Sequence, residues 1–189
     1  MSYLLKKCIK YSMNGNSIYF EGRYTPYYNI IINIAQSVGC ENFLELGIAN
    51  GVNHMFMRNF IPNCVGVDMS KGFEGDISNF YQMTTDQFFE QNTKKFDIIF
   101  IDACHKFDQV KIDFENSLKC LEDRGIIIFH DTDPFDKHML ADSYSSDSYK
   151  IANHVRKEHP ELDFITLPVS SMGLSICNRK DDARHLKFT

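Results

Sequence analysis

Acidic and imidazole side chains follow the two most apolar segments of this sequence. The segment FDIIFIDACH, residues 96–105, is almost wholly apolar until it reaches Asp102, and His105 comes three residues later. The segment GIIIFHD ends in His130 and Asp131. Carboxylate and imidazole groups in this combination can take a proton from a substrate or bind a divalent cation. These four residues are therefore candidates for catalysis or metal binding.

Two earlier apolar segments also carry acids at or near their ends. FLEL contains Glu45 and runs into the turn GIANG, where Gly47 and Gly51 are four residues apart, and VGVD ends in Asp68. The turn lacks the further glycines of a GxGxxG fingerprint, which let a pyrophosphate approach the backbone. Asp68 lies about 20 residues after Gly47, where an acid can accept hydrogen bonds from ribose hydroxyls. The pattern predicts a nucleoside site without a pyrophosphate cradle, and Glu45 suits a ligand with an ammonium or sulfonium charge.

Apolar segments of strand length alternate with amphipathic segments, which predicts an α/β fold with a mainly parallel sheet. We expect strands at 43–46, 64–67, 80–83, 96–101, 126–129, 162–167 and 174–178, and helices at 24–38, 51–60, 87–91, 107–121 and 148–158. Gly125 is predicted to end the fourth of these helices. The segment after Asp131, about 17 residues rich in Asp and Ser, predicts a lid or a mobile loop.

The strand ends are expected to meet in one place. Ligands bind outside the carboxyl ends of the strands in open parallel sheets. A polar residue at the end of one strand would usually be only a solvated charge. Polar residues at the ends of four strands along one edge of the sheet favour a ligand site. The predicted edge carries Glu45, Asp68, Asp102 and the pair His130 and Asp131.

Length and composition predict one globular domain over residues 1–189, with an N-terminal helical cap at 1–39 and a core at 40–178. The net charge of −5 argues against a nucleic-acid partner. No segment has the length and apolar character of a membrane span or a signal peptide, so we expect no membrane partner and a cytoplasmic location. The six scattered cysteines fit reduced thiols. The protein could also form a homo-oligomer, and the sequence does not decide this.

The segments FLELGIANG, VGVD, FDIIFIDACH and RGIIIFHD resemble motifs of the class I methyltransferases that use S-adenosylmethionine. They are most similar to a branch of small O-methyltransferases in which FID, a histidine and HD recur, and the resemblance covers about residues 40–178. It implies a Rossmann-like three-layer sandwich with a mostly parallel seven-stranded sheet whose last strand is antiparallel. It also implies a small-molecule hydroxyl as methyl acceptor, with a sugar or a sugar-bearing metabolite as one class.

The resemblance implies a set of cofactor-binding residues: Glu45, Gly47, Gly51, Asp68, Thr85, Asp86 and Asp102. In this set, Glu45 and the glycine turn would hold the methionine part of S-adenosylmethionine, and Asp68 would bind the ribose. Thr85 and Asp86 would border the adenine, although a plain helix cap is an alternative role for them. Asp76 competes for the adenine role.

By the same resemblance, Asp102, His130 and Asp131 would bind Mg²⁺ or another divalent cation. Mg²⁺ prefers oxygen ligands, so a histidine in this set favours a softer metal or no metal. The alternative is that His105 and His130, with Asp102, manage the proton of the acceptor directly. Four other histidines are expected to have structural or surface roles only: His54, His138, His154 and His159.

Two rival functions remain open at this stage. A Rossmann-type sheet can also serve an NAD-dependent oxidoreductase or epimerase, but Ala49 and Val52 stand where that class needs glycines. A non-catalytic nucleoside-binding module is the other rival. The retained acids and histidines at the strand ends speak against it.

Overall fold

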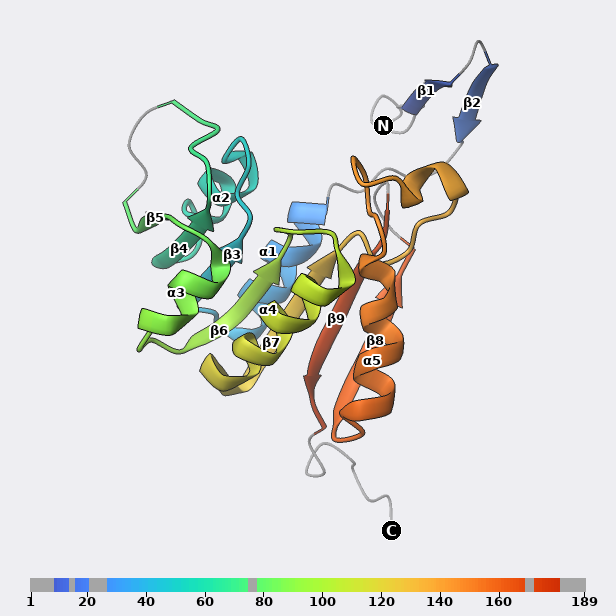
Figure 1. The fold of residues 1–189 in the computed structure, drawn as a ribbon. Helices are drawn as coiled ribbons and strands as arrows, with labels where there is room; N and C mark the ends of the chain where they lie inside the picture. Colours follow the sequence, from blue (N-terminus) through green and yellow to red (C-terminus); the bar gives the residue numbers. More distant parts are fainter. Residues whose placement is uncertain (1–8, 14–15, 21–26, 75–77, 169–171, 181–189) are drawn as a thin grey trace, which may run out of the picture.

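The computed structural model of the chain is a three-layer α/β arrangement, described for residues 9–13, 16–20, 27–74, 78–168 and 172–180 (Figure 1). The central sheet has the strand order β5-β4-β3-β6-β7-β9-β8. Its strands are β3 (Asn42–Leu46), β4 (Asn63–Asp68), β5 (Phe80–Gln82), β6 (Phe96–Ile101), β7 (Leu121–His130), β8 (Leu162–Leu167) and β9 (Leu174–Arg179). All neighbouring pairs are parallel except the two that include β9. The predicted seven-stranded sheet with an antiparallel last strand is confirmed.

Helices cover both faces of this sheet (Figure 1). One face carries α1 (Tyr27–Val38) and α2 (Val52–Met57), and the other carries α3 (Thr85–Gln91), α4 (Phe107–Cys120) and α5 (Ile151–Glu158). The predicted start of the first helix, residues 24–26, lies outside the described residues. Before α1, β1 (Ile9–Met13) and β2 (Asn16–Phe20) form an antiparallel pair within the segment expected to be a helical cap. The domain boundaries stay a prediction.

The central strand β6 shows why its sequence is apolar from Ile98 to its end. Ile99 and Ile101 pack into the cluster that includes residues of α4 and α5, whereas Ile98 and Phe100 pack into the cluster that includes residues of α1 and α2. All four side chains are buried. A strand alternates its side chains between two covered faces, so no position from Ile98 to Ile101 suits a polar residue, and the one acid of β6, Asp97, lies near its start.

The boundary between α4 and β7 differs from the prediction. The helix ends at Cys120, and Leu121 already pairs with Phe96 in the sheet, so Gly125 lies inside β7 and does not stop the helix. Burial of the Leu121 side chain outweighs the local preference for a glycine helix stop. A side chain at position 125 would lie 2.6 Å from the Leu121 side chain, so close packing explains this glycine.

The segment expected to be a lid or mobile loop is held against the body of the protein. It contains η1 (Lys137–Leu140) and leads into η2 (Ser148–Lys150), which directly precedes α5. The buried Ser148 hydroxyl donates to the Asp131 carbonyl at 2.6 Å, and an Asp147 carboxylate oxygen accepts from the Phe107 N–H at 2.7 Å. These contacts fix the segment beside the ends of β6 and β7.

Across the described part of the chain, no helix combines the length and the apolar character needed to cross a membrane.

Candidate active site

The register of the sheet places the strand-end residues in one row. β3 pairs in register with β4 and β6, and β6 pairs in register with β7. The residues at their carboxyl ends therefore follow one another across the sheet in the order Asp68, Gly47, Asp102 and His130. The chain leaves β3 toward β4 and later returns to β6 on the other side, so Gly47 and Asp102 flank the switch point in strand order. This is the place where open α/β sheets bind ligands.

Asp131 joins this row through an unusual backbone conformation. Its φ is 60°, in the left-handed region, which aspartate tolerates better than most residues. An extended residue after His130 would point its side chain to the other face of the sheet. The left-handed turn instead leaves the buried Asp131 carboxylate beside the His130 ring. The sequence predicted the residue but not this turn.

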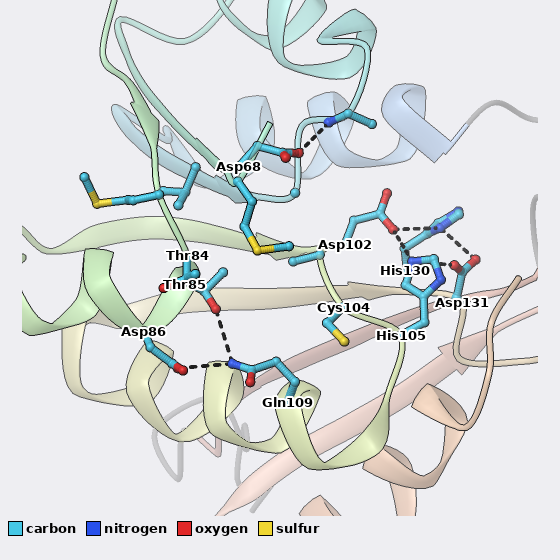
Figure 2. A pocket seen from close by; sticks show the side chains of 16 residues that line it. Asp68, Thr84, Thr85, Asp86, Asp102, Cys104, His105, Gln109, His130 and Asp131 are labelled. Atoms are coloured by element: carbon cyan, nitrogen blue, oxygen red, sulfur yellow. Dashed lines mark hydrogen bonds and ion pairs between the residues drawn. The ribbon is translucent and has the colours of Figure 1, made fainter. Parts of the chain in front are cut away.

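Two histidines and two aspartates form a closed cluster at the ends of β6 and β7 (Figure 2). His130 Nδ1 lies 2.8 Å from Asp131 Oδ1 and 3.3 Å from Asp102 Oδ1. His105 Nε2 lies 3.2 Å from Asp131 Oδ2 and 3.5 Å from Asp102 Oδ1. The second ring nitrogen of His105, Nδ1, contacts the Tyr144 carbonyl. Each imidazole therefore faces both carboxylates.

These contacts shift the pKa values of the cluster. The hydrogen bond to Asp102 is the largest cause that raises the pKa of His105 to about 9. Burial disfavours the charged form of His130, but Asp102 and Asp131 outweigh it and raise the pKa of His130 to about 10. Burial alone would raise the pKa of Asp102, yet the charges and hydrogen bonds of the two histidines lower it. Both imidazoles are therefore cationic at neutral pH.

We expect the cluster to make stability fall at alkaline pH. The ordinary histidine pKa is 6.5, and the folded values of His105 and His130 are about 9 and about 10. A histidine whose pKa is higher in the folded than in the unfolded protein stabilises the folded state. This contribution to the free energy of unfolding is complete below pH 6.5 and is lost as the pH rises through 9 to 10. Thermal unfolding followed by circular dichroism should show Tm falling across this window. In the double variant His105→Gln/His130→Gln, Tm should decrease less over the same pH range. An equal decrease in Tm would contradict the raised pKa values of the two histidines.

One cavity connects this cluster to the end of β4. It has a volume of about 680 Å³ and includes most of the predicted site residues. The predicted residues that line it are Gly47, Asp68, Thr85, Asp86, Asp102, His105, His130 and Asp131. Figure 2 shows Asp68 and Asp86 on one side of the cavity and the cluster of two histidines and two aspartates on the other.

Asp68 shapes the turn after β3. Its Oδ2 accepts hydrogen bonds from the Ile48 N–H at 3.0 Å and the Ala49 N–H at 2.9 Å. Its Oδ1 accepts from the Ser70 N–H at 2.9 Å and the Ser70 hydroxyl at 3.2 Å. Asp68 therefore orders the glycine turn, and any ligand at this carboxylate shares it with backbone N–H groups.

Two predicted cofactor residues do not line the cavity. Glu45 is 2% exposed, and its carboxylate accepts from Asn53 Nδ2 at 2.7 Å and contacts His54 Nδ1 at 3.0 Å. Burial raises the pKa of Glu45, although His54 and Asn53 favour its charged form. Its side chain thus points to α2 and fixes that helix beneath the turn. Gly51 adopts a φ of 74° at the start of α2, against the Phe73 ring. The structure gives both residues a structural position, and their predicted cofactor contact has no support in the cavity lining.

The far end of the cavity is built on α3 and α4. Thr84 caps α3 through a reciprocal pair of hydrogen bonds with Gln87, so the cap predicted for this turn falls on Thr84. Thr85 and Asp86 line the cavity and both accept from Gln109 Nε2, at 3.3 Å and 3.1 Å. Asp76, the alternative adenine residue, lies outside the described residues.

Sequence reasoning missed Gln109 and the apolar wall of the cavity. Gln109 lies near the start of α4, four residues after His105. Its closeness in sequence to a predicted site residue was the only feature that could have indicated a place in the cavity lining. Met69 and Met83 also line the cavity, each just beyond the end of a strand, β4 or β5. Flexible thioether side chains fill irregular apolar spaces and contact aromatic rings favourably. A polar pattern search could not have found them.

Gly47 is required by packing as well as by its conformation. Its φ is 81°, and a Cβ there would lie 2.2 Å from the Asp102 carbonyl oxygen. We expect Gly47→Ala to destabilise the protein by about 3 kcal/mol, since the left-handed penalty and the clash with backbone add. Gly39→Ala is the matched control, because Gly39 has a φ of 67° and no atom within 4 Å of the added Cβ. Gly39→Ala should lower the free energy of unfolding, measured in urea, by about 1 kcal/mol. Equal losses of stability in the two variants would contradict the packing argument.

The comparisons with known proteins agree with this architecture. Residues 44–132 match a family model described as a methyltransferase domain. No curated protein matches the chain in sequence.

Solved structures share the fold at low sequence identity. An O-methyltransferase from Bacillus cereus in complex with SAH is 17% identical, with a TM-score of 0.63 and 82% of each chain covered. The SAH-bound methyltransferase PaMTH1 from Podospora anserina is 15% identical, with a TM-score of 0.63 and coverage of 82% of this chain and 78% of that one. The O-methyltransferase TomG from Streptomyces achromogenes, in complex with SAM, is 13% identical, with a TM-score of 0.61 and coverage of 85% and 82%. The methyltransferase-domain match and the shared fold, with the sheet order and the strand-end motifs, agree with the predicted resemblance to the class I S-adenosylmethionine-dependent methyltransferases.

Proposed function

We propose that this protein transfers a methyl group from S-adenosylmethionine to a hydroxyl of a small molecule. The single observation that carries the proposal is the shared cavity. It joins an acid at the end of β4, Asp68, to the cluster of two histidines and two aspartates at the ends of β6 and β7. A donor nucleoside and an acceptor hydroxyl can therefore lie next to each other within one enclosure.

The cavity fits the proposed donor in size and chemistry. Its volume of about 680 Å³ falls within the usual range of small-molecule sites, ~300–1,000 Å³. Val67, Met69 and Met83 give it apolar walls for a flat base, and Asp68 gives it a carboxylate acceptor for hydroxyl groups. S-adenosylmethionine, when bound, supplies an electrophilic methyl group. The protein must then position the acceptor and manage its proton.

His105 is the proposed proton acceptor for the hydroxyl. Its pKa of about 9 means that only ~1% of molecules carry the neutral imidazole at pH 7, but that imidazole is a strong base. Asp102 and Asp131 stabilise the imidazolium that forms when the proton arrives. His130 keeps a buried Nε2 without a hydrogen-bond partner among the described residues.

A divalent cation is the second way to activate the hydroxyl. Donor atoms of Asp102, His105 and Asp131 all lie within 4.8 Å of one another, so the residues present can form such a site. His130, the predicted nitrogen ligand, contacts both carboxylates as well. A bound cation would lower the pKa of a coordinated hydroxyl.

Chelation separates these two roles. We expect turnover to survive chelator treatment within about twofold if His105 accepts the proton unaided, and to fall by about 100-fold or more if a cation is needed. The measurement is methyl transfer after chelation, followed by addition of Mg²⁺, Mn²⁺ or Co²⁺. Recovery with Mn²⁺ or Co²⁺ but not with Mg²⁺ would assign the cation site to a nitrogen-containing ligand set.

Calorimetry tests the proposed function itself. Titration with S-adenosylmethionine and with its demethylated product should show binding in the micromolar range, whereas NAD should not bind. A panel of hydroxyl acceptors that includes free sugars and sugar-bearing metabolites then tests the acceptor class favoured by the sequence. No binding of either nucleoside at millimolar concentration would refute the proposal. Binding without turnover on the whole panel would favour a non-catalytic module.

A further inference from the structure

A second group of metal-ligand side chains lies outside the cavity, where α4 and α5 pack together. It consists of Glu115 on α4, His154 on α5 and His159 at the carboxyl end of α5. His159 precedes β8, which begins at the sheet edge opposite the strand ends that form the cavity. None of the three residues lines that cavity.

The two imidazoles of the group converge on a single carboxylate oxygen, as ligands around one metal ion would. His154 Nε2 lies 3.0 Å and His159 Nε2 lies 2.9 Å from the same oxygen, Glu115 Oε1. Ligand atoms around a tetrahedral zinc ion sit ~2.0–2.2 Å from the metal and therefore ~3.3 Å from one another. The observed spacings come within a few tenths of an ångström of that requirement. Small side-chain shifts would admit an ion.

The surroundings of the group support the same interpretation. His159 Nδ1 lies 3.2 Å from Glu161 Oε1, so a carboxylate orients the ring through the nitrogen that does not face Glu115. Metal-binding histidines almost always have such a partner on their other nitrogen. The Phe114 ring meets both imidazoles edge to face, with centroids 6.3 Å from His154 and 5.1 Å from His159. One side is therefore apolar, while Glu115 is 37% exposed and leaves an entry path.

We propose that Glu115, His154 and His159 bind a zinc-type transition-metal ion, with Glu161 as the orienting group. Two imidazoles and one carboxylate suit Zn²⁺, Co²⁺ or Ni²⁺, and they do not suit Mg²⁺, which demands oxygen ligands. The three ligands leave a fourth position for water. The ion joins α4 to the end of α5 and the start of β8, so its effect is on stability. This inference is independent of the proposed methyl transfer.

The site is tested by equilibrium dialysis of the untagged protein against Zn²⁺, followed by metal analysis. His159→Gln and Glu115→Gln should each bind one equivalent of zinc fewer than the wild type. His138→Gln is the matched histidine control, and Asp131→Asn removes a carboxylate of the cluster at the cavity. Both should keep the equivalent assigned to the new site. Zinc stoichiometry unchanged by His159→Gln and by Glu115→Gln would overturn the proposal.

Two measurements on the wild type keep the test valid if a variant fails to fold. Zn²⁺ at ~100 times its Kd should raise Tm by about 5–10 °C, whereas Mg²⁺ should not. In imidazole nitrogen spectra, two of the seven histidines, His154 and His159, should respond to Zn²⁺ together. A zinc response confined to the other five would overturn the assignment.

Discussion

Asp68→Ala is expected to weaken S-adenosylmethionine binding by about 100-fold. The carboxylate holds two backbone N–H groups of the glycine turn, at 3.0 Å from Ile48 and 2.9 Å from Ala49, and it faces the cavity. The proposed loss of two hydrogen bonds from the ribose hydroxyls to this carboxylate, at about 1.4 kcal/mol each, corresponds to this factor. Calorimetric titration of the nucleoside, with circular dichroism to check the fold, measures it.

Asp97→Ala provides a closely matched control. Asp97 Oδ2 also accepts from two backbone N–H groups, Glu41 at 3.0 Å and Asn42 at 2.9 Å, but near the start of β6 and away from the cavity. This variant should lose stability by a similar amount and keep its affinity within about twofold. If the two variants weakened binding equally, Asp68 would act only through general stability.

His105→Gln is expected to lower turnover by about 10²- to 10⁴-fold while nucleoside affinity stays within about twofold. General-base groups contribute on this scale, and the His105 imidazole lines the end of the cavity that holds Asp102 and Asp131. The wild-type rate should rise with pH toward the His105 pKa of about 9, because only the neutral ring accepts a proton. The variant should lack this rise.

The pH profile distinguishes a proton acceptor from a residue that only positions its neighbours. A structural role for His105 would lower the rate at all pH values and leave the rise in place. His138→Gln, which changes a histidine outside the cavity lining, should behave like the wild type. Full turnover in His105→Gln would show that the assigned role is wrong.

The sequence by itself determined the order of the elements and the polar edge of the sheet. β6 could be predicted from FDIIFI because burial on two faces favours apolar residues on a central strand, and five of these six residues are apolar. The acid that follows, Asp102, then had to lie at a strand end. The same local logic placed Asp68 at the end of β4 and His130 at the end of β7. The spacing of buried residues and the length of a strand are properties of short segments, so the sequence alone can reveal them.

Only the tertiary structure decided which polar groups pair with one another. Glu45 follows the same strand-end pattern as Asp68, yet its side chain turns to His54 on α2 and away from the cavity. Asp131 reaches the cluster of histidines and aspartates only because of its left-handed φ of 60°.

The histidines expected to be structural show the same limit. His154 and His159 meet Glu115 across separations of 39 and 44 residues. Such contacts depend on how helices pack on the sheet, and no local pattern of residue types encodes that packing. The sequence could therefore predict where acids and histidines gather at strand ends, while packing determined their partners.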